Sequence, residues 1–97
     1  MVTEQNPVLA SMGTASWPAE DGTAYEVALE GINHVVGAYS ALISRAERAG
    51  DAALASELTA AQRAWSARRV SLTPEDRAGV DAVTTESTQA LEQLRNV

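Results

Sequence analysis

Apolar residues between positions 23 and 49 recur at steps of three and four, which is the spacing of one face of an α-helix. Thr23 followed three residues later by Glu26 has the form of a capping box, and Gly50, preceded by two arginines, marks a helix end. The pattern predicts a first helix over residues 23–49. Its main apolar face consists of Tyr25, Leu29, Ile32, Val36, Tyr39, Ile43 and Ala46.

Two further helices are predicted by the cap residues that follow. Asp51 comes directly after the glycine and can cap a second helix over residues 52–69. So short a connection makes the first two helices antiparallel. Thr73 as a cap, with Pro74 at the first helical position, predicts a third helix over residues 74–95.

Three helices with these short connections predict an all-α, up-down-up bundle. Residues 1–22 lack helical periodicity and are rich in small and turn residues, so they are predicted to form an irregular N-terminal arm. Residues 23–97 are then one helical domain, which is the most that a chain of 97 residues is expected to form. Nineteen alanines and the absence of phenylalanine leave few bulky core residues, so close helix packing or self-association must compensate.

Helix one carries a second stripe, made mostly of small residues, beside its main apolar face. At 1.5 Å per residue the first helix spans about 40 Å and the second about 27 Å, so the second cannot cover the N-terminal part of the first. Helix three begins where helix two ends and is not expected to cover it either. We therefore expect dimerisation through helix one, with Trp17 of the arm as a further anchor. The predicted interface consists of Trp17, Tyr25, Ala28, Leu29, Gly31, Ile32, Val35 and Ala38.

Composition and charge exclude several classes of partner and chemistry. The chain has no cysteine, so it has no disulfide, thiol nucleophile or thiolate metal site. The formal net charge of −6 disfavours nucleic acid and anionic membranes, which require a basic surface. No apolar run approaches the ~20 residues of a membrane span, and the N-terminus lacks the pattern of a secretory signal. We expect a cytoplasmic protein of a GC-rich bacterium, since all seven basic residues are arginine.

The single histidine, His34, is the first candidate for chemistry. Glu30 lies four residues before it on nearly the same helix face. Carboxylate-bridged metal sites in helical bundles place Glu and His three residues apart and repeat the pair on a second helix. No second histidine exists here, and no nucleophile motif such as GxSxG is present. We therefore expect no catalytic residue, no metal site and no cofactor.

Arginines surround the second tryptophan and raise the question of nucleic-acid binding. Arg63, Arg68 and Arg69 lie near Trp65, but Trp65 falls on the apolar face of helix two. Arg69, one turn later, is expected to lie over the tryptophan ring. Since the chain is acidic overall, internal pairing of these arginines is favoured over contact with nucleic acid.

These observations predict a non-enzymatic helical interaction module, a regulatory or adaptor protein that binds either itself, as a homodimer, or another helical protein. One alternative is a small-molecule sensor or carrier with a ligand pocket between the helices near Tyr39 and Trp65. A further alternative is a secreted or toxin-neutralising protein whose acidic surface masks a basic target.

Overall fold

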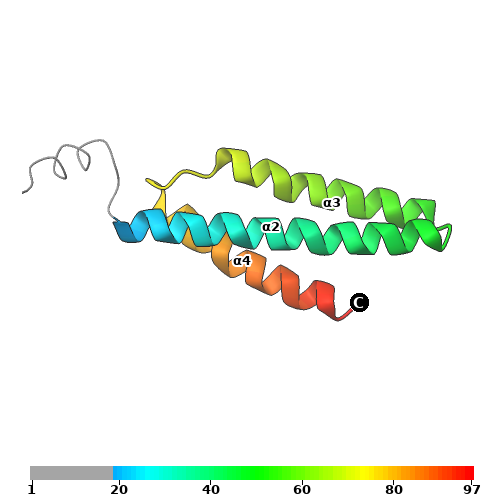
Figure 1. Cartoon of the computed structure of the whole chain (residues 1–97). Helices are drawn as coiled ribbons and strands as arrows, with labels where there is room; N and C mark the ends of the chain where they lie inside the picture. The colour runs from blue at the N-terminus through cyan, green and yellow to red at the C-terminus, as the bar shows by residue number, and fades with distance from the viewer. Residues whose placement is uncertain (1–18) are drawn as a thin grey trace, which may run out of the picture.

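The computed structural model describes residues 19–97, which form three α-helices and no β-strand (Figure 1). Helix α2 covers Ala19–Arg48, α3 covers Ala52–Ser71 and α4 covers Arg77–Arg95. The bounds of α3 agree with the predicted second helix to within two residues. Trp17 and the remainder of the N-terminal segment lie outside the described residues.

Helix α2 is the centre of the fold, with α3 and α4 packed on it (Figure 1). Helix α3 runs antiparallel to α2, because Gln62 near its middle donates to the Val36 carbonyl oxygen at 2.9 Å, whereas Arg69 near its end donates to Asn33. Helices α3 and α4 share no close backbone contact with each other. The three helices are therefore held together mainly through α2.

The core lies where α2 meets α4, and both apolar stripes of α2 contribute to it. Ala28 from the second stripe and Ile32 from the main face are fully buried in one cluster with Val80 and Val83 of α4. Partly buried side chains pack around this cluster, namely Ala24, Tyr25, Val36, Trp65 and Leu72. The wide apolar face of helix one is thus explained by two neighbouring helices of the same chain.

The connection between α2 and α3 has the predicted chemistry. Gly50 has a φ of 75°, which only glycine adopts without strain. The amide of Asp51 donates to the Ala46 carbonyl oxygen at 2.9 Å and that of Gly50 to the Glu47 carbonyl oxygen at 3.0 Å, the two bonds of a Schellman motif. The Asp51 carboxylate then accepts the Leu54 amide at 3.1 Å, which confirms it as the cap of α3.

Helix α2 starts at Ala19, four residues before the predicted start at position 23. Thr23 therefore lies inside the helix, and the predicted capping box does not mark its beginning. Glu20 and Asp21 occupy the first turn, where acidic side chains are stabilised by the positive end of the helix dipole. The last part of the predicted irregular arm, residues 19–22, is thus helical.

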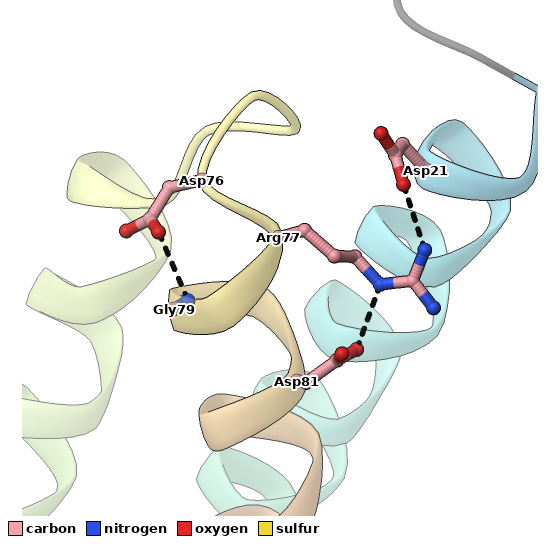
Figure 2. A network of polar contacts seen from close by, with 5 residues as sticks. All are labelled: Asp21, Asp76, Arg77, Gly79 and Asp81. Atoms are coloured by element: carbon pink, nitrogen blue, oxygen red, sulfur yellow. Dashed lines mark hydrogen bonds and ion pairs between the residues drawn. The ribbon is translucent and has the colours of Figure 1, made fainter.

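Helix α4 starts three residues later than predicted, at Arg77 instead of Pro74. Thr73 does not cap it: the Thr73 carbonyl oxygen accepts the Asp76 amide at 3.2 Å in a turn, and Pro74 is buried. The cap is Asp76, whose carboxylate accepts the Gly79 amide at 3.0 Å (Figure 2). Thr73 and Asp76 are both residue types that commonly cap helices. Thr73 forms the turn, and Asp76 caps the helix.

Arg77 joins the first turn of α4 to the first turn of α2. Its guanidinium donates to Asp21 at 2.7 Å and to Asp81 at 2.9 Å (Figure 2). The hydrogen bond to Asp81, and to a smaller extent the one to Asp21, raises the pKa of Arg77 above its ordinary value. This exposed pair of contacts places the beginning of α4 beside the beginning of α2.

Helices α2 and α4 approach each other closely at Gly31. A methyl group on Gly31 would overlap the Ser87 hydroxyl oxygen and lie 3.1 Å from the Ser87 Cβ. Ser87 is only 2% exposed, and its hydroxyl donates to the Thr84 carbonyl oxygen at 3.0 Å. The two helices can approach this closely only because position 31 has no side chain.

We expect Gly31→Ala to lower the free energy of unfolding by about 1–3 kcal/mol, because the added methyl group forces α4 away from α2. Gly37→Ala is the matched control, since nothing lies within 4 Å of a methyl group at that position. It should raise stability by up to about 1 kcal/mol through helix propensity. Urea unfolding followed by circular dichroism measures both, and equal effects of the two variants would contradict the close approach.

The cap of α4 can be tested in the same way. Asp76→Ala should lower the free energy of unfolding by about 1 kcal/mol, because the Gly79 amide loses its acceptor. Asp76→Asn should be nearly neutral, because asparagine caps equally well. Thermal unfolding of these variants beside Thr73→Ala identifies the cap. A larger loss for Thr73→Ala than for Asp76→Ala would place the helix start where the sequence pattern had put it.

Candidate interaction groove

Most residues of the predicted interface on helix one are engaged within the chain. Ala28, Ile32 and Val35 have no exposed surface, and Gly31 faces Ser87 of α4. The remaining described members, Tyr25, Leu29 and Ala38, are half-buried. The side chains expected to meet a partner therefore mainly form the internal contacts of α2.

The N-terminal part of α2 is covered by α4, contrary to the expectation that helix three would not reach it. Helix α4 starts beside Asp21 and runs in the same direction as α2. Val80 and Val83, in its first two turns, pack on Ala28 and Ile32. The overhang predicted from the helix lengths is thus filled by the chain itself.

Trp65 and Tyr39, the predicted lining of a ligand pocket, do not line the groove described below. Trp65 packs against the core cluster and is half-buried. The guanidinium carbon of Arg68 lies 4.8 Å from the centre of its ring. The expected cation–π partner, Arg69, instead donates to Asn33.

His34 lies exposed on α2, as does Glu30. Within residues 19–97, no three histidine, aspartate or glutamate side chains lie close enough together to hold a metal ion. In the same part of the chain, no helix is both long and apolar enough to cross a membrane.

An apolar groove lies at the end of the molecule where α2 turns into α3. Leu42 and Ala46 of α2, with Ala49 just after it, form its floor, and Leu54 and Leu58 of α3 form one side. The C-terminal end of α4 forms the other side, with Leu94 and Val97, and the volume is about 440 Å³. This groove is our candidate functional site, because it brings apolar residues of all three helices to the surface.

The groove exists because α4 ends before α2 does. Asp21 pairs with Arg77, 56 positions further along the chain, and Gly31 meets Ser87 with the same offset. This parallel register places Arg95, the last residue of α4, level with Tyr39. The last nine residues of α2, about 14 Å at 1.5 Å per residue, extend past α4. There α3 still packs on α2, and Ala46 is buried, but the apolar stripe continues beyond the end of α4.

Charged groups are sparse in the groove. Arg45 and Asp51 are its only charged lining residues. Asp51 already accepts the Leu54 amide, whereas Arg45 forms no ion pair with any residue from 19 to 97. Leu54 is 42% exposed, which is high for a leucine on an otherwise apolar helix face. A groove of this kind can bind an apolar surface.

The sequence pattern gives no sign that Leu42, Leu54 and Leu58, from two different helices, line one groove. The helix lengths indicated that helix one was too long to be covered, but the uncovered part was assigned to the wrong end. Only the parallel register of α4 shows which end is free.

Comparison of the chain with protein-family models, with curated proteins and with solved structures gave no match in any of the three.

Proposed function

We propose that this protein is a non-enzymatic helical interaction module, with an up-down-up bundle as its scaffold, that binds an apolar helical surface in the groove at the α2–α3 end. The observation that carries the proposal is the uncovered stretch of α2 beyond α4, where side chains from three helices form a continuous apolar surface. Apolar grooves on the surface of soluble proteins can serve as interaction or ligand-binding sites.

A helix is the occupant that suits the groove best. The groove floor belongs to the same face of α2 that packs against α4 in the N-terminal half of the helix. A helix bound in the groove would therefore pack on α2 as α4 does. Amphipathic helices bind such grooves through apolar residues spaced at i, i+3 or i+4, and i+7. Small floor residues, Ala46 and Ala49, leave room for the leucine-sized anchors of such a helix.

A stapled amphipathic peptide with leucines at that spacing should bind the protein, and a peptide with serines in place of the leucines should not. Leu54→Glu should weaken peptide binding at least about tenfold, because it places a charge in the groove. The variant should still fold, because a glutamate three residues after the cap Asp51 forms a capping box.

Val27→Glu is the matched control. Val27 is 48% exposed, close to the value for Leu54, but lies near the other end of α2. Fluorescence anisotropy of the labelled peptide, titrated with each variant, measures the affinities. Binding that is lost in Val27→Glu and retained in Leu54→Glu would move the site to the N-terminal part of α2 and contradict the proposed groove.

A small-molecule carrier is the second candidate, favoured by the volume of the groove. About 440 Å³ falls within the range of roughly 300–1,000 Å³ typical of ligand pockets. In this case a neutral apolar dye such as phenylnaphthylamine should bind with a fluorescence increase that Leu54→Glu abolishes and Val27→Glu preserves. The ligand should also raise the melting temperature, because it binds only the folded state.

A further inference from the structure

The charges around the groove distinguish between possible occupants. Arg45 and Asp51 both line the groove, one of each sign, and its other lining residues are apolar. A purely acidic or purely basic partner would match one of these charges and oppose the other. A second copy of the same groove, turned by a two-fold axis, matches both, because each residue then meets its opposite on the other copy.

Charge along the whole chain also favours contact at this end. Residues 1–40 contain five acidic residues and no basic one. Residues 41–58, which contain the groove floor and the side formed by α3, hold two arginines and three acidic residues. Two copies of an acidic protein repel each other least when their nearly neutral ends meet and their acidic ends point apart.

The shape of this end permits close contact. Residues 49–53, Ala-Gly-Asp-Ala-Ala, form the tip of the α2–α3 hairpin, and all five are exposed. No side chain larger than aspartate projects from the tip, so another copy can approach the backbone there. The leucines at the groove sides then come within reach of their counterparts.

We propose that the occupant of the groove is a second copy of this chain, with the two hairpin ends packed on each other about a two-fold axis and Arg45 of each copy paired with Asp51 of the other. This inference rests on the proposed interaction function and names its partner. The sequence pattern predicts self-association through the N-terminal part of helix one. The proposed dimer instead forms at the opposite end of the molecule.

Sedimentation equilibrium of the full chain over a range of micromolar concentrations tests the proposal. We expect a monomer–dimer equilibrium whose dissociation constant rises at least about tenfold in Leu54→Glu. Val27→Glu should change it less than about twofold. A monomer at every concentration would overturn the proposal, as would a dimer that Val27→Glu weakens and Leu54→Glu does not.

A double-mutant cycle tests the ion pair without relying on a disruptive substitution. Arg45→Gln removes one charge, and Asp51→Asn removes the other while keeping the cap of α3. Each variant should raise the dissociation constant roughly five- to tenfold, since two symmetry-related pairs are lost. The double variant should be no weaker than either single one, whereas multiplied effects would overturn the pairing.

The outcomes separate this proposal from the function on which it rests. A chain that stays monomeric but binds the leucine peptide in the groove overturns self-association and supports the interaction function. A chain that dimerises through the groove should also bind the peptide more weakly as dimerisation increases, because both compete for the same leucines. A dimer unaffected by Leu54→Glu, together with no peptide binding, would overturn both.

Discussion

The parallel packing of α4 along α2 is the contact on which the rest of this structure depends. Two points set its register: the ion pair between Asp21 and Arg77 and the close approach of Gly31 to Ser87. The first is exposed and therefore contributes little by itself. The second is buried and tolerates no side chain at position 31, so steric fit holds the two helices in register.

This register decides which apolar surface the protein keeps inside and which it leaves outside. The first turns of α4 cover Ala28 and Ile32, where the core cluster forms. Because α4 is shorter than α2 and starts level with it, the same register leaves Leu42 and Ala49 beyond the end of α4, in the groove. The core at one end and the groove at the other are thus two consequences of one helix packing.

The composition explains why such a protein would expose apolar surface. An alanine-rich chain without phenylalanine forms a thin core, and among residues 19–97 only a few side chains are fully buried. Each helix of such a chain gains little from packing on one neighbour, and α3 meets α4 only through side chains, such as the ion pair between Arg68 and Glu86. A further helix bound in the groove would bury leucine side chains, and this burial would stabilise the complex through the hydrophobic effect.

The sequence alone determined the helical content, the α2–α3 hairpin and its caps. These features depend on residues within one or two turns of each other: Gly50 adopts a left-handed conformation, and Asp51 accepts an amide three residues away. The start of α4 was predicted less well because Thr73 and Asp76 both have cap chemistry, and the tertiary contact of Arg77 with Asp21 accompanies the later start. The position of the candidate site could not be predicted, since a stripe of apolar residues does not show which part of it a distant helix will cover. Only the tertiary structure, through the register of α4 on α2, decided that α4 covers the N-terminal stripe and leaves the groove at the hairpin end open.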